Sequence, residues 1–377
     1  MKMKENSLSE KEAWIALQGV SGIGSVLAHR LVKHFGSARD VWGHSVWDYC
    51  AVNRVGTDLA QNLAKGPDMK RVSAILSRTE KLGAWVIHPG SAAYPPRLLE
   101  IYDPPVVLYG RGDPDLLQKK GVAIIGSRRA SSYGRSVASR LAGGVAAAGL
   151  VVISGIAAGI DGVSHQAAME AGGLTVGVKG CGIDQVYPKH HRGLEEKMVE
   201  QGAVVTEYPP GTPPDASHFP ERNRIISGLS MAVVVVEAGS RSGSLITARL
   251  AAEQGRDVMA VPGTVFSWGS QGPHRLIKQG AALVQDSSEV LEELGVEVGE
   301  GFHSHEVERD DLSREEKQVI DNLVEEPQHI DSICAACKMP VQVVSRVLLG
   351  LEIKGVVVSF PGSRYGLNTT SSGKEDS

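Results

Sequence analysis

Short apolar runs recur through the middle of the chain and alternate with segments long enough for helices. Each run is continuous rather than alternating, as expected for parallel strands that are buried on both faces of a sheet. Segments of helical length, such as 135–148 and 244–254, separate the runs. This alternation predicts a doubly wound, mostly parallel α/β sheet within residues 111–297. The predicted strands are 122–125, 151–153, 174–178, 203–205, 232–236 and 258–261.

The preceding segment, residues 8–110, has a helical pattern. Leu27, Leu31 and Phe35 recur at intervals of four, which predicts an amphipathic helix. A glycine-spaced hairpin at 19–24 precedes that helix; it is either a phosphate-binding turn or a packing turn between helices. Proline pairs after Tyr94 and Asp103 predict extended connectors.

The last part of the chain predicts a small separate module. Residues 298–312 form an acidic linker, and the polar tail from Thr369 is expected to be disordered. Between them, Ser313 and Glu316 have the spacing of a capping box at a helix start. Helices at 330–338 and 341–354, followed by a hairpin, predict a winged-helix-like domain over 313–368.

Composition restricts the class of protein. The 377 residues are 42% hydrophobic and 22% charged, which is typical of a globular chain of two or three domains. The first ten residues contain no apolar stretch, so no signal peptide is expected, and the longest apolar run, 145–153, is too short to span a bilayer. Four cysteines are too few for a disulfide framework. The expected location is the reducing cytoplasm, with no membrane partner.

The charge distribution says more than the net charge of −4. Residues 289–316 carry eleven acidic and two basic side chains, which leaves the remainder of the chain at +5. Residues 116–160 contain six basic side chains and no acidic one. A local basic region of this kind favours a nucleic-acid partner despite the overall balance.

Ligands of open α/β sheets bind beyond the carboxyl ends of the strands, so the loops that follow the predicted strands are the first candidates for a site. Gly126, Ser127 and Arg128 follow the first strand and lie where the next helix begins, which predicts phosphate binding. The alternative is a tight turn with solvated arginines. No G-x-G-x-x-G pattern is present, and no acidic residue follows at the distance that a dinucleotide site requires.

Two further loops are rich in small residues. After the second strand, Ser154 and Gly155 begin a segment whose glycines at 155, 159 and 162 would allow a ligand to approach the backbone. In the same segment Asp161 suits a helix cap, and packing is favoured over catalysis for His165. After the fifth strand, the loop and helix start that contain Gly243, Ser244 and Thr247 could form an anion nest. That loop lacks the lysine of a Walker A motif.

The segment 218–227 carries the most informative cluster. Phe219, Arg222 and Asn223 are three or four residues apart and so share one helix face, where they could stack on a base and bind phosphate. The alternative is that Phe219 is a core residue and Arg222 pairs with a carboxylate. Cys334 and Cys337 have metal-ligand spacing but no second pair, so core packing is favoured and no metal is expected. No complete catalytic set is evident.

Eight motifs occur together in the order typical of one family. They are Gly126-Ser-Arg, Ser154-Gly-x-Ala-x-Gly-Ile-Asp161, Tyr187-Pro188, Phe219-Pro-x-Arg-Asn-Arg-Ile-Ile, Glu237-Ala, Ser242-Gly-Ser-Leu-Ile-Thr247, Gly255-Arg-x-Val and Val261-Pro-Gly263. On these residues the chain resembles the DNA-processing protein A family, also called DprA or Smf. The resemblance covers about 115–297. The flanking regions look like the SAM- or helix-hairpin-helix-like and winged-helix-like units that accompany that family.

The resemblance implies an extended Rossmann-like fold that binds single-stranded DNA, forms homodimers and loads RecA in natural transformation and homologous recombination. It implies neither a cofactor nor an enzymatic activity. The DNA-binding residues that it implicates are Gly126, Ser127, Arg128, Ser154, Gly155, Phe219, Arg222, Asn223, Arg224, Gly243, Ser244 and Thr247. Lys179 is added to these candidates although it lies outside the family pattern.

The chain departs from the family pattern at four places. His191 and His274 stand where asparagine is common, and Ala216 stands where some members have a lysine. Lys179 follows a strand where an apolar residue is usual, either as an added phosphate contact or as a solvated strand end.

Two other functions remain open from the residues alone. One is a nucleotide N-glycosidase that uses Glu237 to release free base. The other is a regulator of duplex DNA that binds through residues 313–377.

Overall fold

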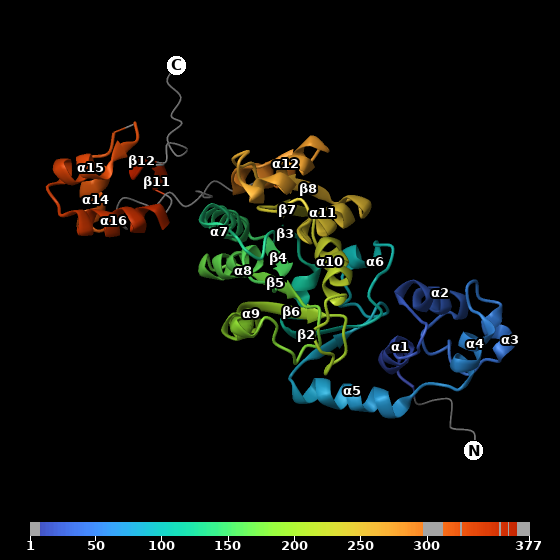
Figure 1. Cartoon of the computed structure of the whole chain (residues 1–377). Coiled ribbons are helices and arrows are strands. Elements are labelled where there is room, and N and C mark those ends of the chain that lie inside the picture. Colours follow the sequence, from blue (N-terminus) through green and yellow to red (C-terminus); the bar gives the residue numbers. More distant parts are fainter. Residues whose placement is uncertain (1–7, 297–311, 325, 354–355, 361, 368–377) are drawn as a thin grey trace. The chain divides into compact units, whose positions relative to one another are not determined.

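The computed structural model describes residues 8–296, 312–324, 326–353, 356–360 and 362–367. Its contacts divide the chain into two compact units, Met1–Val298 and Gly299–Ser377, and each unit has its own hydrophobic core (Figure 1). The predicted disordered tail from Thr369 lies outside the described residues, as does the predicted acidic linker 298–312 apart from Leu312.

The first unit is built on a nine-stranded sheet with the order β1-β2-β6-β5-β4-β3-β7-β8-β9. Strands β3 to β9 run parallel, and β2 pairs antiparallel with β6. The chain reverses its winding between β3 and β7, which lie side by side. The strands are β1 Trp85–Ile87, β2 Leu108–Gly112, β3 Gly121–Ile125, β4 Val151–Gly155, β5 Thr175–Val178, β6 Gly202–Thr206, β7 Ala232–Val235, β8 Asp257–Ala260 and β9 Ala282–Leu283.

The structure confirms the doubly wound sheet and all six predicted strands, with ends that differ by at most two residues. The three strands that the pattern did not predict, β1, β2 and β9, lie at the two edges. They are short, and β2 contains two glycines and an arginine, so they lack the continuous apolar run of a buried strand. Residues 85–110, which the sequence pattern placed in the helical segment and its connectors, therefore contribute β1 and the start of β2 to the sheet.

Helices cover both faces of this sheet. On one face α8 packs against α7 and α9, and on the other face α10 packs against α6 and α11 (Figure 1). The largest core cluster lies between the sheet and the second layer and includes Ile225 and Leu229 of α10. The helices are α6 Pro96–Leu99, α7 Ser132–Ala147, α8 Ile160–Glu170, α9 Arg192–Gln201, α10 His218–Leu229, α11 Ser244–Glu253, α12 Gln271–Lys278 and α13 Ser287–Glu293.

Five helices precede the sheet: α1 Glu10–Gln18, α2 Ser25–Phe35, α3 Val46–Cys50, α4 Thr57–Ala64 and α5 Met69–Lys81. The predicted amphipathic helix is α2, which buries Leu31. The core of these helices includes Tyr109 of β2 and Val204 of β6. The helices and the sheet are therefore joined by a continuous apolar contact.

The second unit has three helices, α14 Arg314–Ile320, α15 Ile330–Cys337 and α16 Val341–Ile353, and a three-stranded sheet of β10 Gln328–His329, β11 Val357–Phe360 and β12 Arg364–Leu367. The predicted capping box of Ser313 and Glu316 begins α14. Cys337 is buried in this core. Within the described ranges no three His, Cys, Asp or Glu side chains are grouped to hold a metal.

No single helix of the described part is both long and apolar enough to cross a bilayer. The one candidate joins α15 to most of α16 across a bend of 108°.

Two glycines test how closely the antiparallel edge of the sheet is packed. Gly112 and Gly149 both have positive φ, at 84° and 81°. They differ in the space beside them: a Cβ on Gly112 would overlap the carbonyl oxygen of Gly202, whereas a Cβ on Gly149 would have no neighbour within 4 Å. We expect Gly149→Ala to lower the free energy of unfolding by about 1 kcal/mol, through backbone strain alone. Gly112→Ala should cost at least about 2 kcal/mol more, because the β2–β6 backbones must separate. Urea unfolding measures both; equal losses would contradict the close approach.

Candidate nucleic-acid interface

A pocket of about 110 Å³ lies at the carboxyl ends of β4 and β5. Arg128 reaches it from the loop after β3, and Phe219 and Arg222 reach it from α10. Its other lining residues are Ile156, Ala157, Ala158, Val178, Lys179, Gly180, Cys181, Tyr187 and Pro188. The structure thus brings Arg128 together with two residues of α10 that lie about ninety positions later in the sequence. They meet at the edge where ligands of such sheets bind.

An aromatic and cationic cluster forms one side of the pocket. The Arg128 guanidinium carbon lies 5.3 Å from the centroid of the Phe219 ring, and the Tyr187 ring lies 5.3 Å from Phe219, centroid to centroid. Arg128 is exposed and Tyr187 is 42% exposed. A flat ring beside an exposed guanidinium can stack on a base while the cation binds a phosphate.

The other side of the pocket rests on a buried charge. Arg222 is 4% exposed and donates a hydrogen bond to the carbonyl oxygen of Val178 at the end of β5. Its charge interacts with the carboxylate of Asp161, and a Cβ on Gly155 would overlap the Arg222 guanidinium. Burial lowers the pKa of Arg222 and raises the pKa of Asp161, and each charge partly offsets the shift of the other. Arg222 Nε has no hydrogen-bond partner among the described residues.

The small residues of the loop after β4 serve internal packing. Gly159 has φ of 85°, and a Cβ there would overlap the carbonyl oxygen of Ser127. A Cβ on Gly162 would lie 2.9 Å from the His191 ring. From the sequence, the glycines at 155, 159 and 162 were expected to let a ligand approach the backbone. That explanation is wrong, because protein atoms occupy the space that a side chain at each position would fill.

His165 lies beneath this loop and is fully buried. Its Nε2 lies 2.7 Å from the carbonyl oxygen of Gly155, and its Nδ1 lies 2.6 Å from Oγ1 of Thr175. Burial lowers the pKa of His165 from 6.5 to about 4, so the ring is neutral at pH 7. These contacts agree with packing, the role that the sequence favoured.

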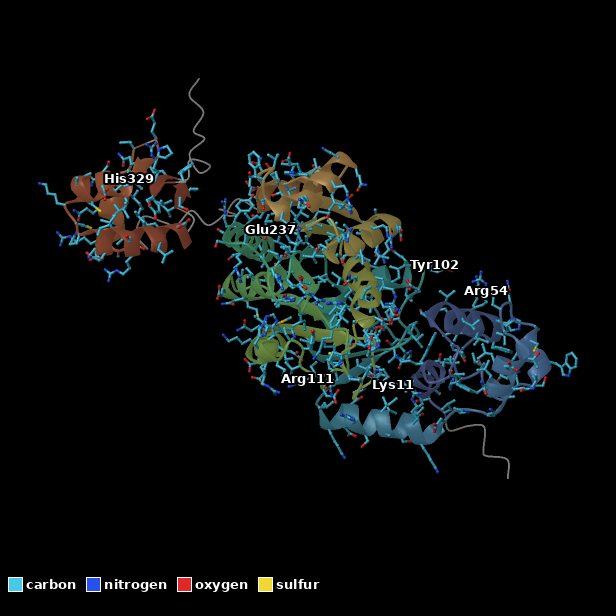
Figure 2. All side chains as sticks on the ribbon, viewed as in Figure 1. Lys11, Arg54, Tyr102, Arg111, Glu237 and His329 are labelled. Atoms are coloured by element: carbon cyan, nitrogen blue, oxygen red, sulfur yellow. The ribbon has the colours of Figure 1, made fainter. Side chains whose placement is uncertain are left out.

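Glu237 is held at the point where the sheet reverses its winding. Its carboxylate accepts hydrogen bonds from the backbone N–H of Ser131, at 2.9 Å, and from the Ser131 hydroxyl, at 2.5 Å. A Cβ on Gly134 would overlap this carboxylate, so the start of α7 lies directly against it. The Glu237 side chain, labelled in Figure 2, is 5% exposed. A general base that takes a proton from the water attacking a nucleotide needs an open face, which this carboxylate lacks.

The remaining predicted residues surround the pocket at different depths. Asn223 reaches the loop after β7 by a 3.4 Å hydrogen bond from Nδ2 to the carbonyl oxygen of Gly243. Ser244 is hydrogen-bonded to Ser242, with 2.8 Å between the two hydroxyl oxygens. Ser154 is buried and donates to the carbonyl oxygen of Ile124, so it joins β4 to β3. Gly126 and Ser127 lie in the turn before Arg128, and Thr247 is buried in α11.

Lys179 is neither the phosphate contact nor the solvated strand end that the sequence allowed. The side chain is fully buried and forms an ion pair with Glu195 of α9. Its ammonium group also donates to the carbonyl oxygen of Ile183, at 3.3 Å. A cation with these partners has no free face for a phosphate.

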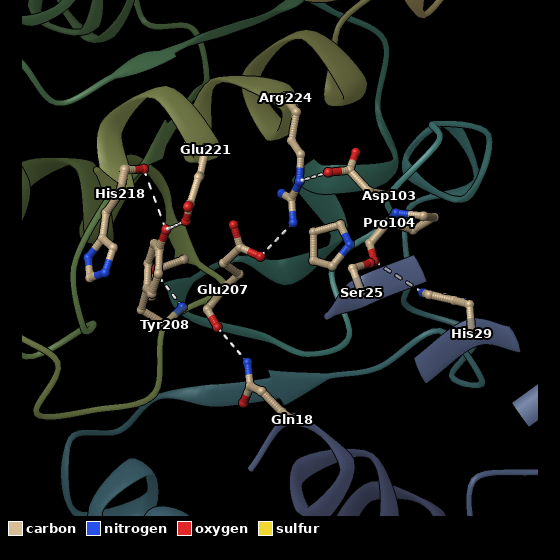
Figure 3. A network of polar contacts seen from close by, with 12 residues as sticks. Gln18, Ser25, His29, Asp103, Pro104, Glu207, Tyr208, His218, Glu221 and Arg224 are labelled. Carbon is tan, nitrogen blue, oxygen red and sulfur yellow. Dashed lines mark hydrogen bonds and ion pairs between the residues drawn. The ribbon is translucent and has the colours of Figure 1, made fainter. Parts of the chain in front are cut away.

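Arg224 also faces away from the pocket, since residues two apart on a helix point to opposite sides. It pairs with Asp103 at 2.8 Å and with Glu207 at 2.6 Å (Figure 3). The carbonyl oxygen of Glu207 accepts a 2.7 Å hydrogen bond from Gln18 of α1. Arg224 thereby connects α10 to the connector before β2 and, through Glu207, to the N-terminal helices.

Three departures from the family pattern can also be placed. His191 Nδ1 lies 3.3 Å from the carbonyl oxygen of Ile156, and His274 Nε2 lies 2.9 Å from that of Gly263, so both hold loop backbone. Ala216 is exposed. Tyr187 was quoted as part of a motif but not as a site residue; an aromatic residue directly before a proline in a loop was the signal that could have found it.

Comparison with known proteins identifies the family. Residues 85–295 match the family model described as DNA recombination-mediator protein A, and residues 304–363 match the DprA winged helix domain. The chain belongs to the DNA recombination-mediator protein A family. This confirms the resemblance and the C-terminal winged-helix domain.

Relatives of this family match along most of the chain. Protein Smf of Escherichia coli is 36% identical over 365 residues, which cover 94% of this chain and 95% of that protein. DNA processing protein DprA of Bacillus subtilis is 43% identical over 225 residues, which cover 59% of this chain and 76% of that protein.

Two solved structures of the family are also similar. DprA of Streptococcus pneumoniae has a TM-score of 0.66 and 33% identity, covering 78% of this chain and 99% of that one. DNA processing protein A of Helicobacter pylori, reported for its unique single-stranded DNA binding mode, has a TM-score of 0.51 and 28% identity, covering 56% of this chain and 95% of that one.

Burial of His165 makes stability depend on pH. The folded state keeps the ring neutral down to about pH 4, whereas in the unfolded state the ring binds a proton near pH 6.5. Protonation therefore favours the unfolded state, so the free energy of unfolding is highest above pH 6.5 and falls as the pH is lowered. We expect the free energy of unfolding to be about 2 kcal/mol lower at pH 5 than at pH 7 because of His165. Urea unfolding of the wild type and of His165→Asn measures the difference. If the two pH dependences coincide, His165 is not the group responsible.

Proposed function

We propose that this chain binds single-stranded DNA in the pocket at the carboxyl ends of β4 and β5 and delivers the strand to RecA. The cluster of Arg128, Phe219 and Tyr187 beside the buried Arg222 is the observation that carries the proposal. It combines a stacking surface with a cation, which is the chemistry of sequence-independent single-strand binding. The binding mode reported for the Helicobacter pylori relative supports it.

We assign different roles to the predicted residues. Arg128 contacts a phosphate, Phe219 contacts a base, and Asn223 lies beside the same path. The backbone of Gly126, Ser127, Gly243 and Ser244 offers N–H groups to the next phosphates. Arg222 holds the floor of the pocket and directs its charge toward it. Ser154, Gly155, Thr247, Lys179 and Arg224 support these groups from inside the fold.

The proposal includes the organisation that the family resemblance implies. The protein acts as a homodimer in the cytoplasm, in homologous recombination and natural transformation. Residues 8–84 and 313–368 flank the binding domain. That domain comprises the predicted 111–297 together with the segment that carries β1 and the start of β2. Residues 298–312 link it to the C-terminal domain. The similarity to Protein Smf over nearly the whole of both chains supports a shared arrangement.

Catalysis forms no part of the proposal. The two groups that a nucleotide hydrolase would use, Glu237 and His165, are both buried and hydrogen-bonded to the protein itself. Incubation with nucleoside monophosphates should therefore release no free base.

The salt dependence of binding tests the role of Arg128. If about four phosphates are neutralised, the logarithm of the affinity for a single strand should fall with the logarithm of salt concentration with a slope of about −3. Arg128→Ala should flatten that slope by about 0.7. Arg140→Ala is the matched control, since Arg140 is an exposed arginine about 12 Å along α7 from the helix start.

Titrations with single-stranded and duplex oligonucleotides of unrelated sequence give both slopes. Tight binding that prefers single strands supports the proposal, and faster assembly of RecA on the bound strand supports delivery. Absence of single-strand binding would overturn it. A preference for duplex that disappears on removal of residues 313–377 would favour the duplex-DNA regulator instead.

A further inference from the structure

An exposed aromatic loop lies between β8 and α12. Phe266 is 96% exposed, the highest value among the large hydrophobic residues that the structure describes, and Val265 and Trp268 are 76% and 59% exposed. Large apolar side chains grouped in this way mark an interaction surface. The proposed site uses none of these residues.

The loop is anchored on both sides of Phe266. Before it, the hydroxyl of Tyr133 in α7 donates to the carbonyl oxygen of Pro262, at 2.7 Å. After it, the N–H of Ala238 donates to the carbonyl oxygen of Gly269, at 2.8 Å. The Trp268 ring covers Gly239, where a Cβ would overlap it. The neighbouring loops therefore position the aromatic residues.

This loop lies on the same edge of the sheet as the pocket. β5, β4, β3, β7 and β8 are consecutive neighbours in the sheet, and the loops that follow them all leave from the carboxyl ends. Four spacings of about 4.8 Å place the carboxyl end of β8 about 19 Å from that of β5. A single strand of several nucleotides spans this distance.

The surface between the two positions is cationic. Arg128 and Arg129 follow β3, Arg241 follows β7, and Arg275 follows the aromatic loop; all four are exposed. Across the segments 126–135, 237–243 and 262–275 the one carboxylate is Glu237, which is buried against Ser131. Exposed arginines without exposed acids complement a phosphate backbone.

We propose that the loop 262–270 is a second base-stacking platform for single-stranded DNA. A strand that fills the pocket continues past Arg129 and Arg241, and bases farther along it stack on Phe266 and Trp268. Aromatic rings interleaved with arginines suit a nucleic acid better than a protein partner, because the platform continues a basic path that starts at the pocket. This inference rests on the proposed single-strand binding and extends it.

Replacement of Phe266 tests the platform. With an oligothymidine of about fifteen nucleotides, Phe266→Ala should weaken binding about fivefold or more, and Phe266→Trp should restore it. The salt slope should stay unchanged, because no charge is removed, whereas Arg241→Ala should flatten it by about 0.7. Trp47→Ala is the matched control: Trp47 is 88% exposed in α3, and its loss should leave affinity unchanged.

The outcomes separate this inference from the proposed function. If the wild type binds no single strand, the proposed function fails. If the wild type binds and Phe219→Ala weakens it, but Phe266→Ala has no effect, the platform alone is wrong. If Phe266→Ala leaves affinity intact and shifts the mass measured by light scattering, the loop joins two copies of the chain and the inference is overturned.

Discussion

The pocket depends on one buried guanidinium group. Arg222 lies between the last carbonyl of β5 and the carboxylate of Asp161, in the space that Gly155 leaves open. A buried cation that loses its partner typically costs about 3–5 kcal/mol, so each of these groups constrains the others. The loops after β4 and β5 are held at a fixed separation as a result. The exposed Arg128 and the half-buried Phe219 at the pocket are positioned relative to this charge.

Helix α10 uses opposite faces for two separate purposes. Arg222 turns toward the pocket, and Arg224, two residues later, turns toward Asp103 and Glu207. Because Glu207 also receives a hydrogen bond from Gln18, the helix that carries Phe219 is tied to the N-terminal helices. The two arginines look equivalent in the sequence, but one supports the candidate site and the other supports the assembly of the unit.

The sequence alone predicted the elements that have a strong local pattern. Continuous apolar runs predicted six strands of the sheet, and the capping box of Ser313 and Glu316 located the start of α14. The edge strands β1, β2 and β9 were not predicted, because they are short and lack a continuous apolar run. The family resemblance implied that Arg128, Phe219 and Arg222 belong to one site, and the structure places these residues around one pocket.

Burial of charge was the part that the sequence could not predict. Arg224 was a candidate DNA-binding residue because it belongs to a motif of the family, and Lys179 was interpreted as an added phosphate contact or a solvated strand end. Both interpretations placed the charge at the surface, where lysine and arginine usually lie. Their partners, Glu195 and Asp103, lie 16 and 121 residues away in the chain, and only the fold brings them into contact. The glycines at 155, 159 and 162 were misinterpreted for the same reason, since atoms distant in the sequence fill the space beside them.

Glu237 places a carboxylate between β3 and β7, where the sheet reverses its winding. In a doubly wound sheet the helix that starts there carries partial positive charge, and in nucleotide-binding relatives of the fold that end attracts a phosphate. Here the carboxylate of Glu237 already occupies the start of α7 and is sealed from solvent. The protein thus supplies its own anion at the crevice. A mononucleotide phosphate that approached it would meet a like charge. The exposed arginines lie instead along the edge of the sheet, where an extended polyanion has room to pass.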